Sequence, residues 1–384
     1  MKIALAINYD YPDYGGMLQA FATQRVLEKH GIKSEAICFD NIKGDINNRK
    51  WKYFLSNLTD LSIVKEKSKL IEKKLCQKFN KELSRKLDKR NRAFEQWCKQ
   101  NFNVSRAFED WHDMAEAMKS YDAVVVGSDQ LWLPSNVSAD YYTLNWVPDD
   151  VNKVCYATSF GIGKIPKKYE ALYRRYLRRI NHLSAREISG QHIISKLTGR
   201  DAQLVCDPAL LLDRSGWEEI VSERLIEDKY IFCYFMGNNP DQRDFVKRLV
   251  KKTGYKVVAL LHLDQYIPTD EEYVDYAPYN ITPADFVSLV KHAEYVCTDS
   301  FHGTVFSINY SKSFFTFKRF NQKASLSTNT RITSLLSTLG LENRLFEGNA
   351  SIDGGLDIEN WVDIQKRVSK FRGESLAYLI GAIK

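Results

Sequence analysis

Residues 291–317 restrict the fold of this 384-residue chain more than any other stretch. Residues 294–297 have the pattern of a short buried strand, and a polar turn follows at 298–304. The pattern then predicts a helix over 305–310 and another strand over 313–317. A strand, a turn, a helix and a parallel strand make one unit of an open α/β sheet. Because such sheets hold ligands at the carboxyl ends of their strands, the turn is the first candidate for an active site.

The turn carries groups that can bind an anion and move a proton. Thr298, Ser300 and Thr304 supply hydroxyls, and His302 supplies a titratable imidazole. The amides from Gly303 onward lie at a predicted helix N-terminus, which favours an anion. The alternative is a capped helix whose histidine only completes a hydrogen-bond network. Because clusters of titratable groups mark functional sites, we favour an active site here.

The length of the chain predicts two domains, because 384 residues exceed the usual size of a single core. Hydrophobic residues make up 44% of the sequence, enough to fill two cores. The sequence lacks a run of 18 apolar residues, and Met1 leads directly into a strand, so we expect a cytoplasmic protein. Its seven cysteines are scattered without a CxxC pair, which predicts reduced thiols and no metal site.

The positive charge of the protein is concentrated in one segment. Residues 43–106 contain 18 Lys or Arg and 7 Asp or Glu, so the rest of the chain is mildly acidic despite a net charge of +7. The segment suits the inner face of a membrane or a phosphate-bearing substrate, and a solvated helical face is the alternative. We expect no nucleic-acid partner, because the sequence has no motif for one.

The first half opens like a doubly wound α/β domain. A strand, a loop, a helix and a strand are predicted at 2–8, 9–16, 17–30 and 33–39. Gly15 and Gly16 lie at the end of the predicted loop. Two adjacent glycines let backbone amides approach a ligand closely, and a structural tight turn is the alternative.

Residues 44–101 interrupt the α/β rhythm with a predicted helical insertion. One apolar stripe is expected along it. The stripe consists of Leu70, Ile71, Leu75, Phe79, Leu83, Leu87, Phe94 and Trp97. A second apolar group lies beside Lys50 and Lys52 and consists of Trp51, Tyr53, Phe54 and Leu55. Such a group can rest on a membrane surface, and docking on the parent domain is the alternative.

Polar or glycine residues follow four predicted strands in the first half. They are Gly15 with Gly16, Ser128 with Asp129, Ser159, and Arg186. Because parallel strands place their carboxyl ends at one edge of a sheet, we expect these residues to line one crevice. Arg186 suits a carboxylate or a phosphate, and a surface ion pair with Glu187 is the alternative.

A second α/β unit begins near residue 213. Its first strand, predicted at 230–235, ends in a turn that contains Gly237 and Asn238. Residues 358–383 have the pattern of a long amphipathic helix. We therefore divide the chain into a first domain at 1–212, a second domain at 213–350 and a final helix within 351–384.

Six short motifs occur in order along the chain. They are YGGMLQA at 14–20, VGSDQLW at 126–132, SFG at 159–161, SARE at 184–187, DPALL at 207–211 and TDSFHGT at 298–304, with NTR at 329–331 downstream. Together they resemble the polysaccharide pyruvyl transferase family over almost the whole chain. The resemblance implies a GT-B-like α/β fold, in which two Rossmann-like, doubly wound domains face a cleft and a final helix returns to the first. It also implies transfer of pyruvate from phosphoenolpyruvate to a sugar as a ketal, without a metal or organic cofactor.

The resemblance also implies roles for individual residues. His302 matches the histidine of the family's polar turn, and Arg186 matches the arginine that the family assigns to phosphoenolpyruvate. Ser300 stands where family members often carry an arginine. A donor other than phosphoenolpyruvate is therefore an alternative. The residues that could supply the missing cation are Lys318, Arg319 and Arg331.

Ketal formation requires a general acid, a site for the anions and a base. We assign the acid to His302, which protonates the methylene carbon of phosphoenolpyruvate. Arg186 and the amides at 303–304 hold its carboxylate and phosphate. Asp129 is the base or a ligand of the acceptor sugar, with Asp299 as the second choice. The other predicted substrate-binding residues are Gly15, Gly16, Gln19, Ser128, Ser159, Gly237, Asn238, Thr298, Ser300, Gly303, Thr304 and Arg331.

Two other functions fit the same frame. One is a GT-B glycosyltransferase with a nucleotide-sugar donor, in which the 298–304 turn binds the phosphates and Gly237 and Asn238 lie near the base. The other is a catalytically silent subunit of a glycan-assembly complex, whose basic insertion docks on a membrane or a partner. For the favoured function, the partners are phosphoenolpyruvate and a saccharide of a bacterial cell-surface glycan or its lipid-linked precursor.

Overall fold

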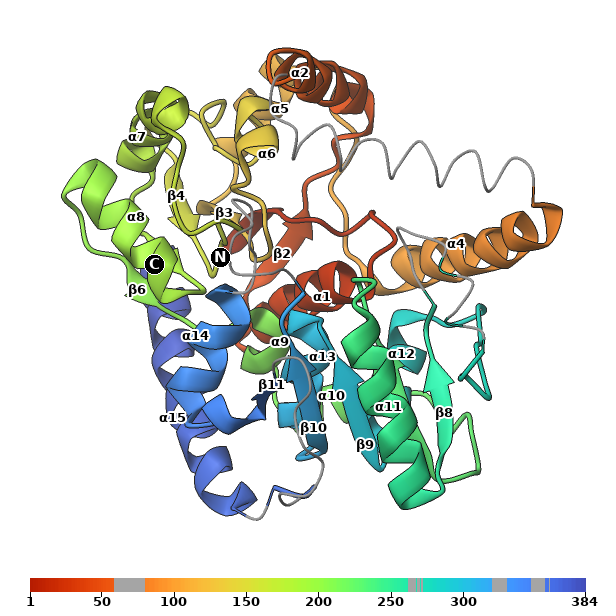
Figure 1. Cartoon of the computed structure of the whole chain (residues 1–384). Helices are drawn as coiled ribbons and strands as arrows, with labels where there is room; N and C mark the ends of the chain where they lie inside the picture. Colours follow the sequence, from red (N-terminus) through yellow and green to blue (C-terminus); the bar gives the residue numbers. More distant parts are fainter. Residues whose placement is uncertain are drawn as a thin grey trace.

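Two parallel β-sheets, one in each half of the chain, form the centre of the molecule, and helices cover them (Figure 1). The structure is a computed structural model. It describes residues 1–58, 80–261, 267, 270, 272–319, 330–346, 356–358 and 360–384. The fold is α/β and GT-B-like, with two Rossmann-like units, as the sequence predicts.

The first sheet has the strand order β2-β1-β3-β4, and all neighbouring strands are parallel. Its strands are β1 (Lys2–Ala6), β2 (Lys33–Ala36), β3 (Ala123–Val126) and β4 (Asn152–Cys155). All four residues of β3 are buried, as expected for a central strand with both faces covered. A bridge between Val154 and His182 connects β4 to the region of a short parallel pair. That pair consists of β5 (Ser184–Ala185) and β6 (Gln203–Leu204).

The helices of the first half largely follow the predicted pattern. They are α1 (Tyr14–Lys29), α5 (Trp111–Met118), α6 (Pro134–Ser138), α7 (Glu170–Arg179), α8 (Ile188–Thr198), α9 (Pro208–Leu211) and α10 (Arg214–Glu218), with 3₁₀ turns η1 (Asp40–Ile42) and η2 (Lys167–Tyr169). The prediction that Gly15 and Gly16 belong to a loop is wrong. The carboxylate of Asp13 accepts a hydrogen bond of 2.6 Å from the amide of Gly16, so α1 begins at Tyr14.

The second sheet has the strand order β11-β10-β9-β7-β8, and it is also parallel throughout. Its strands are β7 (Tyr230–Tyr234), β8 (Lys256–Ala259), β9 (Tyr295–Thr298), β10 (Ser313–Phe317) and β11 (Leu345–Phe346). The sequence did not indicate β11, because a strand of two residues carries no periodic pattern.

The helices of the second half include the one in the polar motif. They are α11 (Pro240–Thr253), α12 (Pro283–His292), α13 (Phe301–Asn309) and α14 (Thr330–Leu339), with the 3₁₀ turn η4 (Glu342–Arg344). The helix predicted to begin at residue 305 begins at Phe301, with Ser300 as its N-cap. His302, Gly303 and Thr304 therefore belong to the first turn of α13 and not to a loop. All residues of this helix are buried, so its start leaves no amphipathic signal in the sequence.

The two halves meet through an apolar interface. The ring of Tyr14, in the first turn of α1, stacks on Phe286 of α12 with centroids 5.2 Å apart. Its hydroxyl donates a hydrogen bond of 3.2 Å to the carbonyl of Ile281. Near α9, the side-chain amide of Asn309 donates to the carbonyl of Ala209 at 2.7 Å. These contacts fix the relative position of the two sheets.

The predicted insertion contains helices α2 (Lys43–Leu55) and α4 (Lys81–Asn101) (Figure 1). The part of the apolar stripe on α4 is confirmed, because its side chains are buried; they are Leu83, Leu87, Phe94 and Trp97. The remaining members of the predicted stripe, Leu70, Ile71, Leu75 and Phe79, lie outside the described residues.

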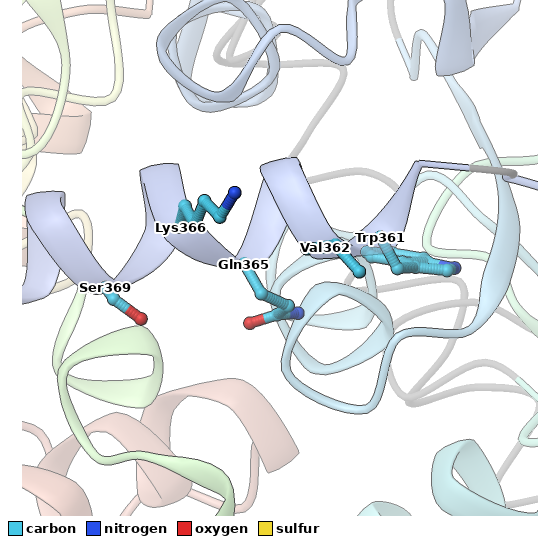
Figure 2. A pocket seen from close by; sticks show the side chains of 5 residues that line it. All are labelled: Trp361, Val362, Gln365, Lys366 and Ser369. Carbon is cyan, nitrogen blue, oxygen red and sulfur yellow. The ribbon is translucent and has the colours of Figure 1, made fainter.

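The final helix, α15 (Trp361–Ile383), runs back to the first sheet (Figure 1). The side-chain amide of Asn152 donates to the carbonyl of Ala382 at 2.9 Å, and the hydroxyl of Tyr378 donates to the carbonyl of Cys155 at 3.0 Å. Near its start, α15 carries an open surface hollow in which Val362 is exposed (Figure 2). Within the described ranges, no helix is long and apolar enough to cross a membrane.

Candidate functional site

A pocket of about 230 Å³ lies where residues that follow strands of both sheets come together. The first half supplies Asn8, Tyr11, Asp13, Gly15, Asp129 and Gln130, and the second half supplies Tyr234, Met236, Ser300, Phe301, His302, Arg319 and Arg331. This is the crevice at the carboxyl ends of parallel strands in which open α/β sheets hold ligands. The volume is below the usual range for drug-sized ligands and suits a small molecule.

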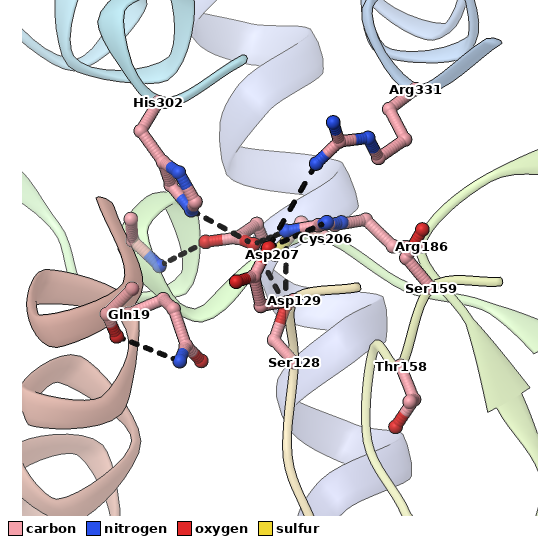
Figure 3. Close-up of polar contacts among 12 residues, drawn as sticks. Gln19, Ser128, Asp129, Thr158, Ser159, Arg186, Cys206, Asp207, His302 and Arg331 are labelled. Atoms are coloured by element: carbon pink, nitrogen blue, oxygen red, sulfur yellow. Dashed lines mark hydrogen bonds and ion pairs between the residues drawn. The ribbon is translucent and has the colours of Figure 1, made fainter. Parts of the chain in front are cut away.

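His302 extends from the first turn of α13 toward the first half of the chain (Figure 3). Its Nε2 atom lies 3.6 Å from Oδ2 of Asp207, and only 8% of its side chain is exposed. On the other side of the ring, Nδ1 lies against Gly15. A Cβ atom at Gly15 would be 2.0 Å from Nδ1, a distance shorter than any that real Cβ atoms show to a neighbouring atom. Gly15 therefore makes room for the imidazole.

Asp207 is buried below the pocket and holds several groups together (Figure 3). Its Oδ2 atom accepts hydrogen bonds from the Ser128 hydroxyl at 2.8 Å and from Nη1 of Arg186 at 2.5 Å. Its Oδ1 atom accepts from the amide of Ala209, so it also caps α9. Burial raises the pKa of Asp207, but the charges of His302 and Arg186 outweigh burial and hold this pKa well below its ordinary value. The residue is therefore a carboxylate.

Arg186 lies beneath the pocket and not in its wall. Its guanidinium is ion-paired with Asp207, and Nη2 lies 3.5 Å from Oδ1 of Asp129. The Cζ atom is 4.4 Å from the centre of the Phe301 ring. The alternative of a surface ion pair with Glu187 is excluded, because Arg186 is buried and its ion pairs are with the two aspartates.

Asp129 connects Arg186 with the open part of the pocket. Its backbone has a φ angle of 81°, a left-handed conformation that side chains other than glycine rarely adopt. Oδ1 also lies 3.8 Å from Nη1 of Arg331. Burial raises the pKa of Asp129, but Arg186 and the other nearby cations outweigh it and lower this pKa. Asp129 is thus an ionised group in the pocket wall.

Two arginines from the second half, Arg319 and Arg331, line the pocket. Arg331 is buried, and burial together with the charge of Arg186 lowers the pKa of Arg331 to about 9. A bound anion would offset that unfavourable environment. Nη2 of Arg319 donates to the carbonyl of Asp299 at 3.4 Å. Lys318, the third candidate for the missing cation, does not line the pocket.

The polar residues around the start of α13 serve mainly the fold. The hydroxyl of Thr298 donates to the carbonyl of Tyr234 at 2.6 Å, and that of Ser300 accepts from the amide of Gly303 at 3.4 Å. The hydroxyl of Thr304 donates to the carbonyl of Ser300 at 3.1 Å, as the amide of Thr304 also does. The prediction that the amides at 303–304 hold an anion is therefore wrong, because both bond within the helix.

The first two amides of α13 are better placed for an anion. They belong to Phe301 and His302, which have no carbonyl of the same helix to donate to. Both residues line the pocket. The amides of α13 that are placed to meet an anion therefore lie two residues nearer the start of the helix than predicted.

Asp299 is occupied by the turn that follows β7. Its two carboxylate oxygens accept hydrogen bonds from the amides of Met236 at 2.6 Å and Gly237 at 2.9 Å. It is therefore not available as a base. Gly237 and Asn238 do not line the pocket, and Asn238 is exposed.

Four more predicted residues of the first half lie outside the pocket wall. Gln19 donates to the carbonyl of Gly16, and the hydroxyl of Ser159 donates to Glu187 at 2.9 Å. Gly16 lies in the first turn of α1, and Ser128 bonds to Asp207 beneath the pocket. These residues support the site and do not face a ligand.

A family model described as polysaccharide pyruvyl transferase matches residues 13–319 of the chain. The chain belongs to the polysaccharide pyruvyl transferase family. The resemblance carried by the six motifs is thereby confirmed, and all six lie within the matched range. A comparison with curated proteins gives no match.

Several solved structures are similar to this pyruvyl transferase family member in overall shape. Staphylococcus aureus MnaA with UDP is 11% identical, with a TM-score of 0.49, over 96% of this chain and 87% of that one. The UDP-GlcNAc 2-epimerase from Methanocaldococcus jannaschii is 12% identical, with a TM-score of 0.46, over 96% and 92%. The Escherichia coli heptosyltransferase WaaC with ADP-2-deoxy-2-fluoro heptose is 10% identical, with a TM-score of 0.37, over 88% and 99%. No conclusion about substrates follows from similarities at this level.

The pocket of this family member brings together six of the residues that the sequence singled out: Gly15, Asp129, Ser300, His302, Arg319 and Arg331. No role was predicted for Asp207, which anchors Arg186 and faces His302. Its only signal in the sequence was its place at the start of the DPALL motif at 207–211. The described residues contain no group of three or more His, Cys, Asp and Glu side chains that could hold a metal ion.

Proposed function

We propose that this protein transfers the pyruvyl group of phosphoenolpyruvate to two hydroxyls of a sugar as a cyclic ketal. One observation carries the proposal: His302 from the second half and Arg186 from the first half approach the same oxygen of Asp207, beneath a small pocket lined by two further arginines. An imidazole, ionised carboxylates and arginine cations thereby lie in one place, which supports a general acid, a base and a site for an anionic donor.

The reaction needs one proton delivered to carbon. Protonation of the methylene carbon of phosphoenolpyruvate turns it into a methyl group and makes C2 cationic. One sugar hydroxyl attacks C2, the bond from C2 to the phosphate oxygen breaks, and the second hydroxyl closes the ring. Of the two hydroxyl protons, one replaces the proton delivered to carbon and the other leaves with phosphate, so the protein ends unchanged.

We assign the general acid to His302 and the base to Asp129. The carboxylate of Asp207 faces Nε2 and orients the imidazole, and the ring lines the pocket, where it can donate a proton to the methylene carbon. A positioned acid of this kind contributes typically about 10²–10⁴-fold to the rate. Asp129 lies in the pocket wall as a carboxylate, where it can accept a proton from the attacking hydroxyl.

The anionic groups of phosphoenolpyruvate would be held by cations from the second half. Arg331 and Arg319 line the pocket, and the first amides of α13 lie beside them. They take the place of the arginine that family members often carry at the position of Ser300. Arg186 acts from below by orienting the carboxylates of Asp207 and Asp129. These assignments make Arg186 a positioning residue and not a direct ligand of the donor.

The acceptor is expected to be a sugar of a bacterial cell-surface glycan or of its lipid-linked precursor. A pocket of about 230 Å³ accommodates the donor and the reacting edge of a sugar, but not a longer saccharide. The rest of the acceptor therefore lies outside the pocket. A lipid carrier would then remain at the surface of the protein.

Mass spectrometry of a candidate saccharide incubated with the protein and phosphoenolpyruvate tests the proposal. We expect the saccharide to gain one pyruvyl ketal while inorganic phosphate is released, and we expect neither change with the His302→Ala variant. A thermal-shift panel of phosphoenolpyruvate against UDP-, CMP- and GDP-sugars separates the alternatives. Stabilisation by a nucleotide-sugar alone would favour a glycosyltransferase, and no shift with any of them would favour a silent subunit.

A further inference from the structure

Three large apolar side chains are exposed along α2 and the turn that follows it. Trp51 is 56% exposed, Leu55 is 59% exposed and Leu58 is 50% exposed. Trp51 and Leu55, four residues apart, lie on one side of α2, and Leu58 follows in the turn after the helix. A single exposed apolar side chain is normal at a protein surface, but three within eight residues form a patch that calls for a partner.

The opposite side of α2 is attached to the first half of the chain, so the helix presents this patch outward. The indole of Trp111 donates a hydrogen bond of 2.9 Å to Asp45, and the Cζ atom of Arg49 lies 5.0 Å from the centre of the Trp111 ring. The ring of Tyr53 lies 5.6 Å from that of Tyr169. Docking on the parent domain, the alternative drawn from the sequence, therefore holds for Tyr53 but not for the exposed patch.

Two lysines border the patch. Residues 43–58 contain four Lys or Arg; Lys43 and Arg49 are paired with aspartates, and Lys50 and Lys52 flank Trp51 in the sequence. Lys52 is exposed. Apolar side chains with a tryptophan among them, bordered by lysines, match the chemistry of a helix that lies in the headgroup region of an anionic membrane.

We propose that the α2 face, formed by Trp51, Leu55, Leu58 and Lys52, docks on an anionic lipid surface. The apolar side chains enter the boundary between headgroups and acyl chains, and Lys52 meets the lipid phosphates. Binding of this kind weakens as salt screens the charge, while the apolar contribution persists.

Docking through α2 would also place the pocket close to the lipid. Lys43, the first residue of α2, has its Nζ atom 2.6 Å from Oδ2 of Asp10. Asp10 precedes Tyr11, which lines the pocket. The start of α2 is thus tied to the loop that lines the pocket, so docking of the helix would bring this loop toward the membrane surface. This consequence rests on the proposed function, because it matters only for an acceptor that is linked to a lipid.

Vesicle flotation with the full-length protein tests the docking. We expect binding to phosphatidylcholine vesicles that contain phosphatidylglycerol, and little binding to phosphatidylcholine alone. The triple variant Trp51→Ser/Leu55→Ser/Leu58→Ser should lower the partition coefficient at least about 100-fold, because three large apolar side chains no longer enter the bilayer. Lys52→Glu should lower it about tenfold. Val362→Ser, which removes an even more exposed apolar side chain from α15, is the control and should change nothing (Figure 2).

Brominated lipids give a readout specific to α2. They should quench part of the tryptophan fluorescence of the bound wild-type protein, and the Trp51→Phe variant should lose that part while it still binds. The proposal is overturned if the wild-type protein does not float with anionic vesicles, or if the triple variant floats as well as wild type. Neither result depends on turnover, so a failure here leaves pyruvyl transfer to a water-soluble acceptor as a separate question.

Discussion

The Nε2 atom of His302 lies 3.6 Å from Oδ2 of Asp207, although the two residues belong to different halves of the chain. The same oxygen accepts a hydrogen bond from Arg186. A single buried carboxylate therefore fixes both the imidazole and the guanidinium that the sequence placed in the site. The geometry of the pocket depends on this carboxylate more than on any residue that faces the solvent.

Replacing Asp207 by Asn should destabilise the protein strongly. The amide removes the nearer of the two carboxylates that pair with the buried guanidinium of Arg186 and leaves only Asp129 at 3.5 Å, and loss of one partner of a buried ion pair typically costs about 3–5 kcal/mol. Urea denaturation measures the change. Asp149→Asn is the matched control, because Asp149 pairs with Arg179 but is 85% exposed, and we expect a loss below about 1 kcal/mol. Equal losses in the two variants would contradict the role given to Asp207.

The same carboxylate predicts how stability depends on pH. The pKa of Asp207 is lower in the folded protein than in the unfolded chain, where it is about 3.9. Its stabilising contribution is therefore complete above the unfolded pKa and is lost as the pH falls through the folded pKa. The free energy of unfolding of the wild-type protein should decrease below about pH 4. The Asp207→Asn variant should lack this part of the decrease.

Gly15→Ala should disable the site without unfolding the protein. The added Cβ atom would lie 2.0 Å from Nδ1 of His302, so the imidazole must move. We expect kcat to fall at least about 100-fold, the scale on which a misplaced catalytic group costs rate. Gly373→Ala is the control: Gly373 lies in α15, and nothing is within 4 Å of its added Cβ atom. That variant should keep full activity and gain up to about 1 kcal/mol of stability.

Arg331→Gln should weaken the binding of phosphoenolpyruvate more than it slows the chemical step. The side chain lines the pocket, and a charge-assisted hydrogen bond to an anion contributes about 1.5–3 kcal/mol. We expect KM for phosphoenolpyruvate to rise about 10- to 100-fold with a smaller change in kcat. Steady-state kinetics measure both. Arg248→Gln, on the exposed side of α11, should leave both constants unchanged, and a matching loss there would point to a general charge effect.

Much of the fold could be predicted, because the two sheets consist of apolar runs that alternate with periodic helices. The first residues of the helices were harder to predict. Asp13 and Ser300 cap α1 and α13, so these helices begin three and four residues earlier than the apolar pattern predicts. As a result, Gly15 and Gly303 were placed in loops. Their small size instead makes room for His302 and for Thr298.

Several residues of the candidate site were predicted, but the contacts among them were not. His302, Asp129 and Arg331 meet in the pocket as the strand-end rule predicts. Asp207 was missed because its partners, His302 and Arg186, are distant in sequence and only the folded chain brings them together. For the same reason Ser159 was taken for a ligand of the substrate, whereas it bonds to Glu187.

The rate of pyruvyl transfer by His302→Ala, measured in a single turnover beside wild type with a saccharide that wild type modifies, tests the account most directly. Phosphoenolpyruvate should raise the Tm of the variant as it does that of wild type, because the arginines that hold it remain. The rate should nevertheless fall at least about 100-fold, because the proton donor to the methylene carbon is gone. A variant that binds the donor and transfers pyruvate at a rate close to wild type would contradict the account.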